Sequence, residues 1–122
     1  MLIDFSFKNV RSFKDEVTFS MEVGEGITDY AEENIIASGE IDVVKSSFIF
    51  GGNASGKTNV IRAFQLLRQI VVDGTASELE LLPRDTFANE SGDTNFKIHF
   101  IKNDNLYYYE LNYDWDAIIN EC

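Results

Sequence analysis

The stretch GGNASGKT, residues 51–58, fits the pattern G-x-x-x-x-G-K-[ST] at every position. Its small residues allow backbone N–H groups to turn inward around a phosphate chain. The short aromatic and β-branched run before it, KSSFIF at 45–50, is typical of a buried strand, and a helical period begins at Lys57. A strand, a glycine-rich loop and a helix in this order predict a phosphate-binding loop (P-loop, or Walker A motif).

The predicted loop assigns chemistry to individual residues. The helix that follows directs the positive end of its dipole at the phosphates. We expect Lys57 to reach the β- and γ-phosphates and the Thr58 hydroxyl to ligate Mg²⁺. The predicted cofactors are therefore ATP and Mg²⁺, with Thr58 as the metal ligand and no residue assigned as catalytic. The loop residues expected to contact the nucleotide are Gly52, Asn53, Ala54, Ser55, Gly56, Lys57, Thr58 and Asn59.

Regular periodicities surround the loop and predict an α/β fold. The helix should run from Lys57 to about Asp73, with Gly74 as its C-cap. Its apolar face is predicted to contain Val60, Phe64, Leu67 and Val71. Strands are indicated by alternation in MLIDFSFKNV (1–10), EVTFSMEV (16–23), NFKIHFI (95–101) and LYYYELNY (106–113). The last two form a hairpin through KNDN, while 24–40 and 75–93 are predicted to be mainly loop.

Composition limits the class of protein. The 122 residues, 44% of them apolar, suit one domain with a core of its own. A net charge of −11 and scattered basic residues argue against a free-standing nucleic-acid binder. The single cysteine, Cys122, permits no internal disulfide, which favours a reducing compartment. The N-terminus does not have the layout of a signal peptide, and no apolar run is long enough for a membrane span. We therefore expect a cytoplasmic protein.

Three segments together resemble a known group of ATPases. They are FSFKNVRSFKDEVTFSME (5–22), SSFIFGGNASGKTNVIRAF (46–64) and NFKIHFIKNDNLYYYEL (95–111). They are similar to the opening of an SMC/RecF-like ABC-type ATPase, within the AAA-family ATPases grouped with OLD nucleases and prokaryotic defence ATPases. The NVRSF element upstream of the P-loop is more specific than the loop itself. The resemblance implies a P-loop NTPase lobe with antiparallel strands beside the P-loop strand and helix.

The resemblance also extends the predicted site. It implies that Arg11, from NVRSF, lies against the nucleotide phosphates. Asn53 corresponds to the asparagine of the family's P-loop, and Ala54 stands where SMC proteins commonly have glycine. Phe13 is expected to be a core anchor.

Such ATPases also use an acidic strand ending in Asp-Glu, a signature motif and a switch histidine. Asp73 continues the predicted helix, Glu121 follows an asparagine, and His99 faces outward on a predicted strand. We therefore expect residues 1–122 to be the N-terminal lobe of a longer ATPase, a fragment that binds ATP. Its hydrolysis would require C-terminal elements and a head-to-head homodimer, and nucleic acid would be reached only through the full-length assembly.

The alternative is a non-catalytic interaction module with a relic P-loop. It would act through the acidic surface and a Tyr-rich face, which packs either on absent sequence or on the chain's own helix. Nucleotide binding distinguishes the two readings. The residues of that face are Tyr107, Tyr109, Leu111 and Tyr113.

Overall fold

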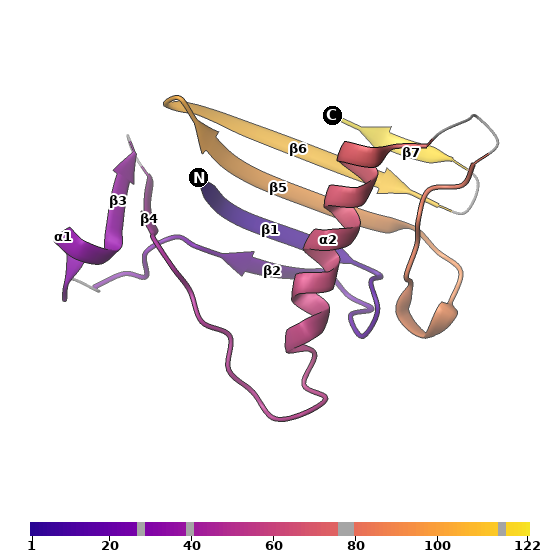
Figure 1. Ribbon diagram of the computed structural model, residues 1–122, viewed down its shortest axis with the longest axis horizontal. Helices are drawn as coiled ribbons and strands as arrows, with labels where there is room; N and C mark the ends of the chain where they lie inside the picture. Colours follow the sequence, from indigo (N-terminus) through magenta and orange to yellow (C-terminus); the bar gives the residue numbers. More distant parts are fainter. Residues whose placement is uncertain (27–28, 39–40, 76–79, 115–116) are drawn as a thin grey trace.

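The computed structural model describes residues 1–26, 29–38, 41–75, 80–114 and 117–122. A five-stranded antiparallel sheet forms its main layer, and one long helix, α2 (Lys57–Asp73), crosses it (Figure 1). The expected α/β class is confirmed, with every strand pairing of this sheet antiparallel. In the order β2-β1-β5-β6-β7, the strands are β2 (Val17–Ser20), β1 (Leu2–Lys8), β5 (Thr94–Lys102), β6 (Asn105–Tyr113) and β7 (Ile118–Glu121).

The core lies between the sheet and α2. Alternation in β1 buries Ile3, Phe5 and Phe7, as the sequence predicts. The ring of Phe5 stacks on Phe64 of α2, with 3.9 Å between the ring centroids. Large apolar side chains from two elements thus meet at the middle of the layer. The buried cluster consists of Phe5, Phe7, Val10, Ala63, Leu67, Ile70, Phe96, Leu111 and Tyr113.

Helix α2 has the predicted bounds and ends at Gly74, whose N–H donates to the carbonyl of Ile70 over 3.1 Å. Its buried stripe consists of Ala63, Leu67 and Ile70. The expected burial of Val71 is wrong, because this side chain is 56% exposed. At 100° per residue, Val71 lies on the flank of the stripe, where it lines an apolar hollow of about 410 Å³ against the sheet.

The hairpin of β5 and β6 forms as predicted. Asn103 and Asp104 connect the strands with φ of 52° and 60°, left-handed values that asparagine and aspartate tolerate in tight two-residue turns. The Tyr-rich face divides along β6: Leu111 and Tyr113 are buried, whereas Tyr107 is 45% exposed. Its inner half therefore packs on the chain's own core, and its outer half faces solvent.

Residues 24–40 contain more regular structure than expected. They include a short helix, α1 (Ala31–Asn34), and a strand, β3 (Ile35–Ser38), which pairs with β4 (Ile41–Val44) in a separate two-stranded sheet. Val43 of β4 is fully buried and packs with Ile3 of β1, and Ile41 packs against the same cluster. Residues 27–28 and 39–40 of this stretch lie outside the described residues. Residues 76–79 also lie outside the described residues. The described part of 75–93 is loop, as predicted, except for one 3-10 turn at Phe87–Asn89.

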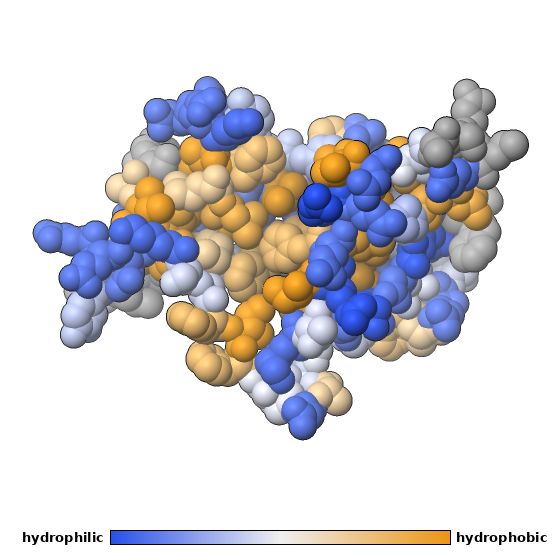
Figure 2. Space-filling model, in the orientation of Figure 1, coloured by the Kyte–Doolittle hydropathy of each residue, from blue (hydrophilic) through white to orange (hydrophobic). Residues whose placement is uncertain are grey.

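The strand predicted before the P-loop is wrong. Residues 46–50 belong to the connection between β4 and α2 and have no strand partner in the described part of the chain (Figure 1). Phe50 is 87% exposed and stacks on exposed Phe48, with 6.2 Å between the ring centroids. Figure 2 shows apolar side chains along this segment below the sheet. A strand needs backbone partners on a neighbouring strand, and the sheet supplies none here.

Among the described residues, no helix combines the length and apolar character needed to cross a membrane.

Candidate phosphate-binding site

The predicted loop leads directly into the N-terminal end of α2. Gly56 is the N-cap residue, with a left-handed φ of 89°. The first N–H groups of a helix have no carbonyl four residues earlier to accept them, so they point out of the helix end. A hollow of about 420 Å³ lies there, within the size range of ligand pockets. Its lining consists of Asn53, Ala54, Ser55, Gly56, Lys57, Thr58 and Asn59.

Lys57 folds back into the loop. Its ammonium donates to the carbonyl oxygens of Gly51 and Gly52, each over 2.5 Å, and lies 3.3 Å from the Ser55 hydroxyl. Thr58 is exposed beside it. The loop is therefore closed around its own lysine. Phosphate oxygens are stronger partners for an ammonium than neutral carbonyls, so the lysine can exchange one set for the other.

The NVRSF element forms a tight turn. The backbone groups of Val10 and Phe13 exchange hydrogen bonds of 3.0 and 2.9 Å, with Arg11 and Ser12 between them. Arg11 has a φ of 51°, a left-handed conformation that is uncommon for a residue with a long side chain. Such backbone strain concentrates at functional sites, where surrounding contacts maintain it.

This turn is bonded to the first turn of α2. The Nε atom of Arg11 donates to Oδ1 of Asn59 over 2.8 Å, and Nδ2 of Asn59 donates to the Ser12 hydroxyl over 2.8 Å. A Cβ atom on Gly56 would lie 3.1 Å from Cζ of Phe13 and 3.2 Å from Oγ of Ser12. Position 56 therefore requires glycine for two reasons: its φ is left-handed, and the Phe13 and Ser12 side chains approach its backbone closely. The two elements that the sequence singled out are brought together.

Phe13 packs as expected. Its ring contacts that of Phe7 edge to face, with 5.1 Å between the centroids. This contact attaches the turn to the core, so the position of Arg11 depends on buried packing as well as on hydrogen bonds.

A second loop holds Arg11 from the other side. The carbonyl of Asp85 accepts the Arg11 N–H over 2.7 Å, and the Asp85 carboxylate forms an ion pair with NH1 of Arg11. The loop is anchored by Tyr113, whose buried hydroxyl donates to the carbonyl of Pro83 over 2.8 Å. Buried Asn9 also binds it, accepting the N–H of Phe87 over 3.1 Å and donating to Gly92. No signal in the sequence indicated Asp85, which belongs to no recognisable pattern, and no role was predicted for Asn9 although it is the first residue of NVRSF.

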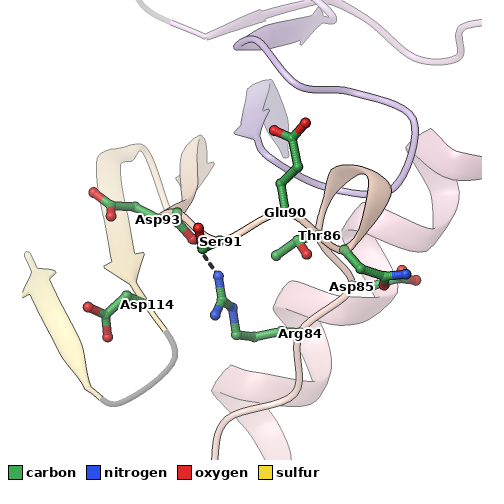
Figure 3. A pocket seen from close by; sticks show the side chains of 9 residues that line it. Arg84, Asp85, Thr86, Glu90, Ser91, Asp93 and Asp114 are labelled. Carbon is green, nitrogen blue, oxygen red and sulfur yellow. Dashed lines mark hydrogen bonds between the residues drawn. The ribbon is translucent and has the colours of Figure 1, made fainter.

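Another hollow, of about 690 Å³, lies within this loop (Figure 3). Arg84 hydrogen-bonds the carbonyl of Gly92 across it, and Asp93 and Asp114 line the same side. In the part of the chain that the structure describes, no group of three or more acidic, histidine or cysteine side chains is arranged to hold a metal ion.

The remaining acidic and histidine candidates have other partners or positions. Asp73 ends α2, and 16 steps of 1.5 Å separate it from Lys57 by about 24 Å. Glu121, on edge strand β7, accepts a hydrogen bond of 2.8 Å from the Tyr109 hydroxyl. His99 lies 2.8 Å from the Asp4 carboxylate on the sheet. That none of the three serves the loop stays a prediction.

Comparison with protein families identifies a match that includes the predicted P-loop. The model of the family described as "AAA domain, putative AbiEii toxin, Type IV TA system" matches residues 46–121, more than half of the chain. The comparison with curated proteins gives no match.

Proposed function

Because the chain belongs to the AAA-domain family whose model matches residues 46–121, we propose that it binds ATP and Mg²⁺ through residues 51–58. Family membership indicates a nucleotide-binding, ATPase-type domain in general. The finer proposal is supported chiefly by one observation. The turn at 9–13 is hydrogen-bonded to the first turn of α2 through Asn59. The Arg11 guanidinium therefore lies at the same end of the helix as the Lys57 ammonium.

The predicted loop residues from Gly52 to Thr58 each have a role in this proposal. Lys57 would exchange the carbonyls of Gly51 and Gly52 for the β- and γ-phosphates. The Thr58 hydroxyl would ligate Mg²⁺, which supplies charge neutralisation between the phosphates. Backbone N–H groups between Gly52 and Gly56 would surround the phosphate chain. Asn53 and Ser55 line the hollow, as does Ala54, whose φ of 63° is one that glycine adopts more easily.

We further propose that the chain is of the SMC/RecF/OLD-like, ABC-type kind. The family match begins at Ser46 and covers the P-loop. The NVRSF turn lies outside the matched residues, and its contacts with Asn59 and Gly56 are a separate argument. The resemblance implies that Arg11, on a turn upstream of the P-loop, is a second positively charged side chain at the phosphates.

Hydrolysis, in this proposal, needs elements from additional sequence and a head-to-head homodimer. Those elements are the acidic strand and the signature motif. The exposed apolar segment at 46–50 supports a need for further strands, because Phe48 and Phe50 expose large rings to water. Nucleic acid would be contacted only by the complete assembly, since the chain carries a net charge of −11.

Isothermal titration calorimetry with ATP and Mg²⁺ tests the proposal. Wild type should bind, and Lys57→Ala should lose at least about tenfold in affinity, since a charge-assisted hydrogen bond contributes roughly 1.5–3 kcal/mol. Lys102→Ala is the matched control, because it removes an exposed lysine at the β5–β6 turn. Equal binding by wild type and Lys57→Ala would contradict the P-loop assignment. No binding by wild type would favour the interaction module, with the outer half of the Tyr-rich face, at exposed Tyr107, as its first candidate surface.

A further inference from the structure

The guanidinium of Arg11 lies between two side chains of different charge, those of Asn59 and Asp85. Asn59 accepts from Nε over 2.8 Å and is itself fixed by its hydrogen bond to Ser12. Asp85 forms an ion pair with NH1. One partner is neutral and belongs to the helix that begins at the P-loop. The other is charged and belongs to the separate loop that Tyr113 anchors.

We infer that Asp85 is an internal competitor for the phosphate of the nucleotide, and that Asn59 is the pivot about which Arg11 turns from one anion to the other. In the free protein the Asp85 carboxylate neutralises Arg11. A nucleotide must displace that carboxylate before Arg11 can contact a phosphate, so Asp85 lowers the affinity. Asp85 and Asn59 are positioning residues that act through Arg11. This inference rests on the proposed function.

The Asp85 carboxylate is not needed to keep its loop in place. The backbone bond from the Arg11 N–H to the Asp85 carbonyl, 2.7 Å long, does not involve the side chain. Further anchors are the Tyr113 hydroxyl on Pro83 and the Asn9 amide on Phe87. Replacing Asp85 with asparagine therefore removes charge while these attachments remain.

The ion pair is also accessible enough to exchange. The side chain of Arg11 is 33% exposed and that of Asp85 is 45% exposed. Exposed ion pairs are weak because water screens both charges. A polyphosphate carries more charge than one carboxylate, so it competes effectively for the same guanidinium. Arg11 can keep its Nε bond to Asn59 during this exchange, since only the ion pair to NH1 has to break.

In this inference Asn59 has a role in addition to the one predicted. The sequence assigned it to direct nucleotide contact. In this structure its amide oxygen accepts from Arg11 and its amide nitrogen donates to Ser12, so both ends of the side chain are engaged within the protein. It connects the helix to the turn and would influence the nucleotide through Arg11.

The test is ATP–Mg²⁺ calorimetry on the full 122-residue chain with a double-mutant cycle. Asp85→Asn should bind ATP about fivefold more tightly than wild type, the scale of an exposed ion pair. In the Arg11→Ala background, Asp85→Asn should change nothing, because no guanidinium remains to be released. Glu90→Gln is the matched control: it removes one carboxylate charge from the same loop, but its partner is Lys14, at 3.2 Å. Its affinity should match wild type within about twofold.

Several results would overturn the inference. Unchanged or weaker binding by Asp85→Asn, with Lys57-dependent binding by wild type intact, would refute it and leave the proposed function standing. Tighter binding that persists in the Arg11→Ala background, or that Glu90→Gln reproduces, would show simple repulsion of the phosphate instead. Absence of ATP binding by wild type would refute both proposals. Melting curves establish that each variant is folded, and Asp85→Ser provides a second charge-removing change if Asp85→Asn is not.

Discussion

The phenol of Tyr113 connects the core to the loop that carries Asp85. Its side chain is fully buried, its ring stacks on Phe96 with 6.4 Å between centroids, and its hydroxyl donates to the Pro83 carbonyl over 2.8 Å. Tyr113→Phe keeps the ring and removes only the hydroxyl. The Pro83 carbonyl then loses its partner in a partly buried position, which costs about 1–3 kcal/mol of unfolding free energy.

For a chain of this length, that loss lowers the melting temperature by roughly 3–5 °C for each kcal/mol. Thermal unfolding followed by circular dichroism, together with urea unfolding, measures both quantities. Tyr107→Phe is the matched control, since it removes the same atom from the same strand where the side chain is 45% exposed. It should change the free energy by less than about 0.5 kcal/mol. Equal effects of the two substitutions would refute the assigned hydrogen bond, as would no effect of Tyr113→Phe.

Alkaline pH provides a second reading of the same residue. Burial raises the pKa of Tyr113 above its ordinary value of 10.0 because it penalises the charged phenolate. A group whose pKa is higher in the folded than in the unfolded protein contributes fully to stability at pH values below its unfolded-state pKa. That contribution is lost as the pH rises from the unfolded-state pKa to the folded-state pKa. The wild-type free energy of unfolding should therefore fall above pH 10. Tyr113→Phe should show a shallower fall, because it removes one of the groups whose pKa folding raises. Among the described residues, Tyr108 and Tyr109, with pKa values raised to about 12, still contribute, as does Lys97, whose pKa is raised by its hydrogen bond to Glu16.

Three further predictions concern the site. In calorimetry, Arg11→Ala should weaken ATP binding less than Lys57→Ala does, because Arg11 approaches from outside the loop and its charge is already neutralised by Asp85. A larger loss of affinity in Arg11→Ala than in Lys57→Ala would contradict this order. Gly56→Ala should lower the free energy of unfolding, measured in urea titrations, by about 1–3 kcal/mol. The residue has a φ of 89°, and the added Cβ would lie 3.1 Å from the Phe13 ring. An unchanged urea midpoint would argue against the packing of the turn on the helix. The purified chain should release phosphate from ATP no faster than background in a steady-state assay, whereas steady hydrolysis abolished by Lys57→Ala would reveal an overlooked catalytic carboxylate, with Glu121 and Asp73 the first to test.

Local periodicity determined much of the fold. The helix from Lys57 to Asp73 and its end at Gly74 follow from apolar spacing and a C-cap, both properties of adjacent residues. The β5–β6 hairpin follows from two alternating runs around Asn103 and Asp104. The strand expected before the P-loop failed because strand formation needs a partner, and an apolar pattern at 45–50 does not say where that partner is.

The site itself depended on contacts between distant residues. The sequence identified the P-loop and NVRSF as separate motifs. Only the tertiary structure bonded Arg11 to Asn59, 48 positions away, and paired it with Asp85, 74 positions away. It also returned Lys57 to the carbonyls of its own loop. A motif specifies which side chains are available. The partner of each charge is decided by which segments the packed core brings within hydrogen-bond distance, and here that depends on the burial of Phe7 and Tyr113 beneath the two loops.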